Sequence, residues 1–338
     1  MHRKRIVSAL SALSAAVVVS GALTAGAYAT PSKHAAEGAA PTAAPSGLNG
    51  PYLYLGWGSP PKATSVMSAT GIRQFTMAFM LSDGGCNPKW DGTRALTGGT
   101  DQSTINSIRS AGGDVTVSFG GWSGNKLGEK CSSAGALAGA YQKVVDAYKL
   151  KSIDIDIEAT EVSNATVRQR VIDALKTTKT KNPGLKVYVT FGTTTTGPTA
   201  DGKDLVKRGA AKGLDAEWAV MPFDFGGQGS VDMAAATKSA VDGLKNTVAS
   251  EYKLSSDAAY RKVGFSSMNG HTDQAGEIVS VADFKSMVSY ATSHHLSRVS
   301  FWSLNRDRKC GSGGGGDACS GIEQGTYDFT KVLAGYNG

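Results

Sequence analysis

The sequence predicts an α/β fold, specifically a (β/α)8 barrel, also called a TIM barrel. Between residues 50 and 338, eight short strand-like segments alternate with longer segments of helical character. Strands that alternate with helices predict a parallel sheet, and eight such units close a barrel. The alternative is an open doubly wound sheet. Its first strand would be followed by a glycine fingerprint, whereas here the chain continues into Trp57-Gly-Ser-Pro-Pro.

The expected strands are short and spread along the whole chain, as a barrel requires. They cover residues 52–56, 75–79, 114–118, 153–157, 186–190, 218–221, 262–265 and 298–302. The clearest helices cover residues 136–147, 167–179, 234–248 and 281–295. In the last of these, Val281, Phe284, Val288 and Ala291 recur at helical spacing.

Residues 1–29 have the pattern of a secretory signal peptide. A basic start (residues 2–5) precedes a small-residue apolar run from Ile6 to about Gly26 and an Ala-x-Ala cleavage motif that ends at Ala29. A membrane anchor is the alternative, but the cleavage motif argues against it, and no other stretch approaches the ~20 apolar residues of a transmembrane helix. We therefore expect a secreted, extracellular protein that does not act in a membrane.

Residues 30–49 predict a flexible lead-in, because Ala, Pro, Thr, Ser and Gly dominate and little can be buried. One domain is then expected over residues 50–338. The formal charge is +7, and loss of the leader removes three basic residues and leaves +4. This mild excess without a dense basic run gives little reason to expect a nucleic-acid partner.

The four cysteines predict disulfide bonds, because their number is even and a signal peptide precedes them. Three pairings are possible. Cys310 and Cys319 are nine residues apart and can close a local loop, which leaves Cys86 with Cys131. A zinc site is the alternative, but no histidine lies near these cysteines in the sequence. We expect neither a metal nor another cofactor.

The fourth expected strand carries three acidic residues that alternate with isoleucines. Residues 153–158 read Ile-Asp-Ile-Asp-Ile-Glu, so Asp154, Asp156 and Glu158 share one face, with neighbours about 7 Å apart. The isoleucines face the helices, and the acids therefore point into the barrel, which Val, Ile and Leu normally fill. Because neighbouring buried carboxylates cannot all ionise easily, at least one pKa should rise. Glu158, at the mouth, is then suited to act as a general acid.

Two other interpretations of this strand remain open. Its acids could simply face water on a half-exposed sheet, since alternating patterns are common in ordinary strands. They could also hold a divalent cation, although metal ligands usually come from several strand ends.

Motifs at the ends of four strands resemble those of glycoside hydrolase family 18. That family carries Asp-x-x-Asp-x-Asp-x-Glu on strand four, and its last three acids match here. Residues 118–121 (Ser-Phe-Gly-Gly) are similar to its Ser-x-Gly-Gly, residues 221–224 (Met-Pro-Phe-Asp) to its Met-x-Tyr-Asp, and Trp302 to its strand-eight tryptophan. The segments 223–226 and 267–270 look closest to a branch of bacterial and archaeal chitinases that lacks the first Asp.

The resemblance implies a chitinase that acts with retention and without a protein nucleophile. Glu158 would protonate the glycosidic oxygen, and the substrate's own 2-acetamido group would attack the anomeric carbon. Asp156 would orient the acetamido N–H and stabilise the oxazolinium intermediate. Asp154 would lie below and let Asp156 share a proton.

The resemblance also implies substrate-binding residues and a partner. Trp302 would stack under a sugar ring, Asp224 would help to hold the acetamido group, and Met221, Phe79 and Asn269 would complete the binding site. The partner would be chitin or a chitooligosaccharide, bound by a monomer. The alternatives are an endo-β-N-acetylglucosaminidase that acts on N-glycans and a chitin-binding protein without catalysis.

Two positions depart from the family pattern. Lys151 replaces the first Asp of strand four and is expected to lie deep, near the base of the barrel or paired with a carboxylate there. Phe223 replaces the tyrosine and therefore has no hydroxyl to offer the acetamido oxygen.

Overall fold

The computed structural model describes residues 49–227, 229–311 and 316–338. The signal peptide predicted at residues 1–29 lies outside these residues, as does the lead-in of residues 30–49 except for Asn49. Across the described residues, we find no helix that combines the length and the apolar character needed to span a membrane.

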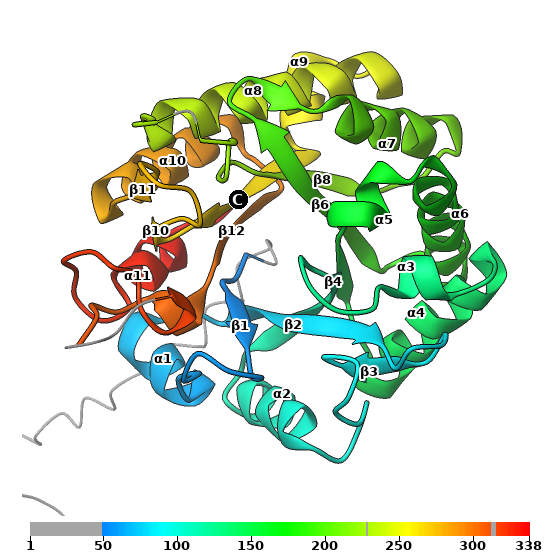
Figure 1. The fold of residues 1–338 in the computed structure, drawn as a ribbon, viewed down its shortest axis with the longest axis horizontal. Coiled ribbons are helices and arrows are strands. Elements are labelled where there is room, and N and C mark those ends of the chain that lie inside the picture. Colours follow the sequence, from blue (N-terminus) through cyan, green and yellow to red (C-terminus); the bar gives the residue numbers. More distant parts are fainter. Residues whose placement is uncertain (1–48, 228, 312–315) are drawn as a thin grey trace, which may run out of the picture. The chain divides into compact units, whose positions relative to one another are not determined.

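Eight parallel strands form the predicted barrel, with helices around its outside (Figure 1). Each strand lies beside the next one along the chain, so every crossover between neighbours runs in the same sense. In spatial order the strands are β1 (Tyr52–Tyr54), β2 (Gln74–Ser82), β4 (Asp114–Gly120), β5 (Ser152–Asp156), β6 (Lys186–Thr194), β8 (Glu217–Met221), β9 (Val263–Met268) and β12 (Arg298–Trp302).

The remaining elements cover the barrel or decorate its loops. Short strands are β3 (Pro88–Trp90), β7 (Gly197–Pro198), β10 (Gly270–His271) and β11 (Ile278–Val279). The α-helices are α1 (Ala63–Thr70), α2 (Thr100–Ser110), α3 (Leu127–Lys130), α4 (Ala134–Tyr148), α5 (Ala159–Ser163), α6 (Ala165–Lys181), α7 (Ala200–Ala211), α8 (Met233–Tyr252), α9 (Ser256–Tyr260), α10 (Val281–His294) and α11 (Asp328–Ala334), and the 3₁₀ helices are η1 (Leu304–Arg306) and η2 (Gly316–Ala318).

The seam between β1 and β12 is bridged by side chains. The Oδ1 atom of Asn49 accepts the N–H of Val299 at 2.8 Å, and the Ser300 hydroxyl donates to the Gly50 carbonyl at 2.7 Å. Farther along the seam, Oδ1 of Asn305 accepts a hydrogen bond from the Tyr54 N–H at 3.2 Å, and Nδ2 of Asn305 donates to the Tyr54 carbonyl oxygen at 2.8 Å. These bonds satisfy backbone groups at the edges of the two end strands, which would otherwise need a ladder partner.

Strand β5 separates the two sides of the barrel as the alternation predicted. Ile153, Ile155 and Ile157 are at most 1% exposed and belong to the large core shared with the surrounding helices. Complete burial of each isoleucine contributes about 1.5–3 kcal/mol. Asp154 and Asp156 point the other way, into the barrel, where they are 0% and 3% exposed.

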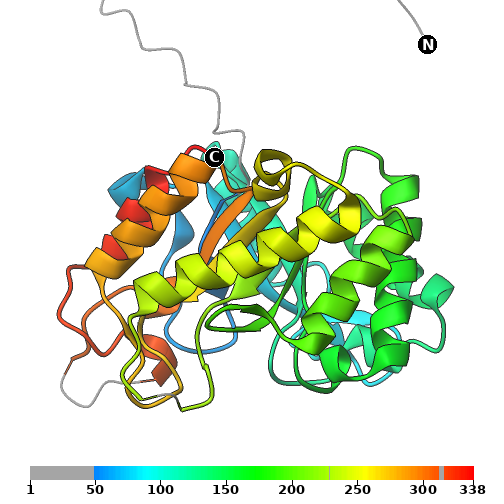
Figure 2. The ribbon, with the colours of Figure 1, turned by 90° about the horizontal axis from the view of Figure 1, so that it is seen from above.

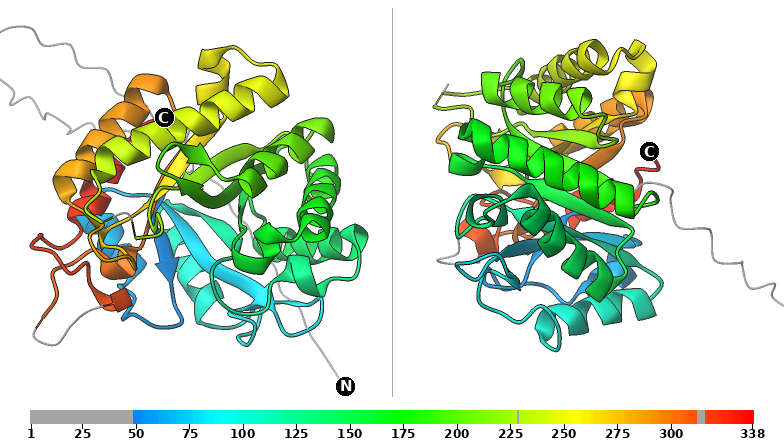
Figure 3. Two further views of the ribbon diagram at one scale, coloured as in Figure 1. Left: turned by 45° about the horizontal axis from the view of Figure 1, so that its top comes forward. Right: turned by 90° about the vertical axis from the view of Figure 1, so that its right-hand side faces the viewer.

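The two ends of the barrel carry different segments of the chain. In Figure 2 the carboxyl terminus lies at one end and the orange-to-red loop after β12 at the other, and Figure 3 shows the same separation. Lys151 precedes β5 at the base, where its ammonium group lies 3.0 Å from the carboxylate of Asp114. The expected pairing of Lys151 with a carboxylate is therefore confirmed, and this lysine takes no part at the mouth.

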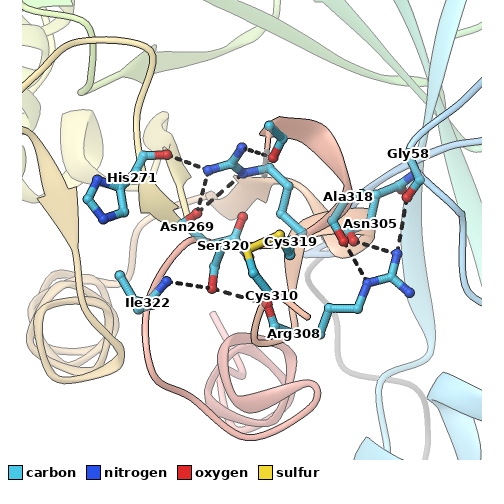
Figure 4. Close-up of a disulfide and its surroundings, with 12 residues drawn as sticks. Gly58, Asn269, His271, Asn305, Arg308, Cys310, Ala318, Cys319, Ser320 and Ile322 are labelled. Carbon is cyan, nitrogen blue, oxygen red and sulfur yellow. Dashed lines mark hydrogen bonds between the residues drawn. A yellow bond between two sulfur atoms is a disulfide. The ribbon is translucent and has the colours of Figure 1, made fainter. Parts of the chain in front are cut away.

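Two disulfides join the expected pairs, Cys86 with Cys131 and Cys310 with Cys319. Figure 4 shows that Arg308 fans out beside the second disulfide. Its guanidinium donates to the carbonyls of Ala318 at 2.7 Å, Asn305 at 2.8 Å and Gly58 at 3.1 Å. One arginine thus connects the disulfide loop to the β1 loop at the barrel mouth.

The close approach of β4 and β5 predicts a large effect of Gly120→Ala. Gly120 has φ +103°, and a Cβ atom there would lie 2.1 Å from the Asp156 carbonyl oxygen. Gly84 has a similar φ of +106° but open space around it. We expect Gly84→Ala to lower the free energy of unfolding by about 1–2 kcal/mol, and Gly120→Ala by at least about 2 kcal/mol more, through overpacking. Urea denaturation measures both values, and equal losses would contradict the prediction.

Candidate active site

The innermost acid is saturated with hydrogen-bond donors. Oδ2 of Asp154 accepts from the hydroxyls of Tyr52 and Ser118, each at 2.7 Å. Its Oδ1 accepts from the Thr190 hydroxyl and the Arg298 guanidinium, again at 2.7 Å. Asp154 is 0% and Arg298 1% exposed. This is the hydrogen-bonding pattern of an ionised carboxylate, with four donors from four different strands.

The two inward aspartates differ in their hydrogen bonding. The donors around Asp154 occupy both of its oxygens, two on each. Asp156, one step nearer the mouth, keeps a buried Oδ1 atom without any hydrogen-bond partner. The sequence could not reveal this, because Arg298 lies 144 residues from Asp154 along the chain. The negative charge of Asp154 raises the pKa of Asp156, and the expected sharing of a proton between the two stays a prediction.

Asp156 is poised to carry a proton. Burial raises its pKa well above the ordinary value, and the negative charges of Glu158 and Asp154 raise it further. Lys126 and Arg298 oppose this effect. The unsatisfied Oδ1 atom is at the same time a free acceptor for a ligand N–H group.

Glu158 follows β5 and lies at the mouth, partly exposed, as predicted. Burial raises its pKa to about 7, Asp224 contributes in the same direction, and Lys126 lowers it. A carboxyl group with this pKa is protonated in a useful fraction near neutral pH and can both give and take a proton.

Asp224 reaches the same region from the loop after β8. Its backbone has φ 54°, and its N–H and that of Phe225 donate to the two carboxylate oxygens of Glu277 at 2.7 and 2.8 Å. Oδ1 of Asp224 accepts the Asp273 N–H at 3.1 Å, and burial raises the pKa of Asp224. Glu277, which the sequence did not single out, therefore shapes the turn that presents Asp224.

Aromatic rings form a separate cluster at the mouth. Phe79 and Trp302 stack with ring centroids 5.5 Å apart and an angle of 15° between their planes. Tyr52 and Tyr54 pack against Trp302, each at 6.0 Å between centroids. Phe79 and Trp302 are both partly exposed, so an apolar face remains available on which a sugar ring can stack.

Two further tryptophans that the sequence analysis did not single out are exposed after barrel strands, and one of them adjoins the aromatic cluster. Trp57, after β1, is 48% exposed and lies 6.5 Å from Trp302 between ring centroids. Trp122, in the loop after β4, is 73% exposed. Large aromatic side chains that stay exposed are candidates for ligand contact, and their exposure could not be inferred from the sequence.

Met221 and Asn269 are less accessible than expected. Met221 is 7% exposed and lies at the end of β8 near the floor. Asn269 is 0% exposed, and its Oδ1 atom accepts the Ser303 N–H at 2.8 Å. Asn269 thus holds the backbone next to Trp302 through Oδ1, while its Nδ2 atom has no hydrogen-bond partner, and direct sugar binding by Asn269 stays a prediction.

Two charged residues near Glu158 were not anticipated. Glu161 on α5 is 2% exposed, its Oε2 atom has no hydrogen-bond partner, and burial raises its pKa to about 8. Lys126, just before α3, is 3% exposed.

Within residues 49–227, 229–311 and 316–338, no group of three or more His, Cys, Asp or Glu side chains is arranged to hold a metal ion.

Two curated proteins are similar in sequence. The chain is 27% identical over 279 residues to a probable bifunctional chitinase/lysozyme of Escherichia coli, which covers 78% of this chain and 31% of that protein. It is 26% identical over 277 residues to endochitinase 11 of Metarhizium anisopliae, with 78% and 53% covered. The chain thus spans only 31% and 53% of the lengths of these two relatives. No family model matches the sequence.

Solved structures share the fold. Active domain 2 of a thermostable chitinase from Pyrococcus furiosus, solved as catalytic-site mutants with chito-oligosaccharides, matches with a TM-score of 0.76 and 23% identity over 85% of this chain and 93% of that one. A family 18 chitinase of Pseudoalteromonas aurantia matches with a TM-score of 0.53 and 17% identity over 75% and 94%. The comparisons therefore confirm the barrel fold and the similarity of this chain to proteins named as chitinases.

Breaking the buried pair should destabilise the barrel. Arg298→Met leaves the Asp154 charge buried among three hydroxyls without a cation, and we expect a loss of about 3–5 kcal/mol in the free energy of unfolding. Adding Asp154→Asn removes that charge, so the double variant should recover part of the loss. Chemical denaturation of both variants tests this, and a double variant less stable than Arg298→Met would contradict it.

Glu161 should make stability depend on pH. Its folded-state pKa of about 8 lies above the ordinary 4.5, so its contribution is fully present below pH 4.5 and is lost as the pH rises through 8. Glu161→Gln should therefore gain thermal stability relative to the wild type at pH 9 but not at pH 4. Glu323→Gln, on the surface, is the matched control. Melting temperatures across this range decide, and parallel curves for wild type and Glu161→Gln would refute the assignment.

Proposed function

We propose that this chain is a secreted chitinase of the family 18 type, which hydrolyses the β-1,4 linkages of N-acetylglucosamine polymers with retention. The observation that carries the proposal is Glu158, an acid at the barrel mouth with a pKa near 7, next to a buried Asp156. The named activities of the similar proteins support the same substrate class.

Substrate-assisted catalysis fits the positions of the two outer acids. Protonated Glu158 would give its proton to the glycosidic oxygen as the bond to the anomeric carbon breaks, and the acetamido oxygen of the same sugar would form a bond to that carbon. The acetamido N–H would donate to the free Oδ1 atom of Asp156. Ionised Glu158 would then take a proton from the water that opens the oxazolinium ring, which restores the acid.

The inner acid and the aromatic rings would support this reaction. Asp154, held by Arg298, keeps a fixed negative charge below Asp156. This charge favours the protonated form of Asp156, or the binding of a positively charged group beside it. Trp302, backed by Phe79, would carry the sugar ring whose linkage is cut. Phe223 offers no hydroxyl, so the acetamido oxygen would depend on Asp224 and the enclosing apolar surface.

The leader-like residues 1–29 and the two disulfides support secretion, since disulfides persist in oxidising compartments. We further expect the protein to act as a monomer on chitin or chitooligosaccharides, because the mouth contains all the residues that this mechanism uses.

Glu158→Gln tests the proposal on chitin hexamer. We expect it to lower kcat by about 10²–10⁴-fold, while wild-type kcat/KM should fall as the pH rises through about 7, where Glu158 loses its proton. Product anomers followed by NMR should show retention. Equal activity of the two proteins would overturn the proposal.

Two further measurements separate the alternative functions from a chitinase. Release of glycans from a glycoprotein without cleavage of the hexamer would identify an endo-β-N-acetylglucosaminidase. Tight hexamer binding without new reducing ends would identify a binding protein.

A further inference from the structure

A buried lysine closes the loop that follows β4. The Nζ atom of Lys126 donates to the carbonyl oxygens of Gly121 and, at 2.6 Å, of Ser123. The Gly121 N–H in turn donates to the Asp156 carbonyl at 2.9 Å. Lys126 therefore fixes residues 121–126 to the end of the strand that carries the acids. A lysine that is only 3% exposed and bonded to carbonyls, not to a carboxylate, needs a further explanation.

The acidic groups around Lys126 explain its burial. Its positive charge lowers the pKa of Asp156, of Glu158 and of Glu161, and at the two glutamates no other group opposes the effect of burial more strongly. Burial in turn lowers the pKa of Lys126 itself, against the attraction of these acids and of Glu129. One cation thus faces several buried carboxyl groups from one side.

Glu161 is held beside this lysine by close packing. A Cβ atom at Gly128 would lie 2.1 Å from Oε1 of Glu161, and one at Gly120 would lie 3.5 Å from Oε2. Both glycines flank the Lys126 loop. The charged groups that face Glu158 are therefore Lys126 from this loop, Asp156 on β5, Asp224 after β8 and Glu161 on α5. Lys126 is the single cation among them.

We propose that Lys126 is a positioning residue for Glu158. It fixes the 121–126 loop against Asp156, and its positive charge stabilises the ionised form of Glu158 between release and recovery of the proton. The inference rests on the proposed function and deepens it. When Glu158 releases its proton to the leaving group, it becomes an anion in a site that already holds Asp154. The buried cation of Lys126, held by the 121–126 loop, stabilises that anion and keeps Glu158 reactive near neutral pH.

Neutral replacements separate the charge of Lys126 from its role in the loop. Lys126→Gln keeps an N–H donor for the loop carbonyls but carries no charge, and Lys126→Met keeps the length of the side chain. Lys126→Arg keeps the charge. Lys130→Met, on the exposed surface of α3 four residues away, is the matched control.

The readout is the pH dependence of kcat/KM on chitin hexamer, with circular dichroism to establish folding. Without the cation the pKa of Glu158 rises, so the alkaline limb of both neutral variants should move up by about one pH unit. It should stay at the wild-type position in Lys126→Arg and Lys130→Met. Below pH 6 the neutral variants should lose at least about tenfold in kcat, because ionised Glu158 is less stable after proton transfer.

The outcomes distinguish the two levels of the argument. A wild type that does not cleave the hexamer overturns the proposed function. A wild type that cleaves it, while Glu158→Gln does not, leaves that function standing. In that case, folded Lys126→Gln with an unmoved alkaline limb overturns the role of Lys126, even if its activity or melting temperature falls. If Lys126→Met fails to fold, Lys126→Gln alone decides.

Discussion

The ion pair between Asp154 and Arg298 in the barrel interior is the interaction on which the site depends. It joins β5 to β12 across the barrel, and hydroxyls from β1, β4 and β6 complete the shell around the carboxylate. A charge in this position would be costly to bury alone, and the shell removes most of that cost. The result is a fixed negative charge below Asp156, which helps to keep the proton affinity of Asp156 high.

The sequence revealed the framework better than the surroundings of the acids. All eight barrel strands and the inward face of the acidic strand were predicted, because periodicity along one strand is a local property. Arg298 appeared only as the first residue of a strand, since no local pattern tells which distant carboxylate an inward side chain will meet. The sequence analysis did not single out Lys126, Glu161 or Glu277 for a similar reason. Each lies in or beside a loop, where the path of the chain depends on tertiary contacts.

The structure also separates stability from binding. The large core lies between the strands and the helices, whereas the rings around Trp302 form a distinct small cluster at the mouth. Asn269, which was predicted to contact sugar, secures the backbone at Ser303 through its amide oxygen. An amide oxygen is a typical ligand-binding group, and only its hydrogen bond in the structure shows that this one holds the protein's own backbone. Side-chain type alone could not distinguish these roles.

The bridged seam between β1 and β12 has a consequence for where the folded unit starts. Composition places residue 49 in the flexible lead-in, but the side chain of Asn49 satisfies the backbone of Val299 on the last strand. The amino-terminal limit of the barrel is therefore set by a hydrogen bond and not by the first apolar residue. Proteolytic trimming that removed Asn49 would leave the Val299 N–H at the seam without this partner, while the bonds of Ser300 and Asn305 would still bridge the two end strands.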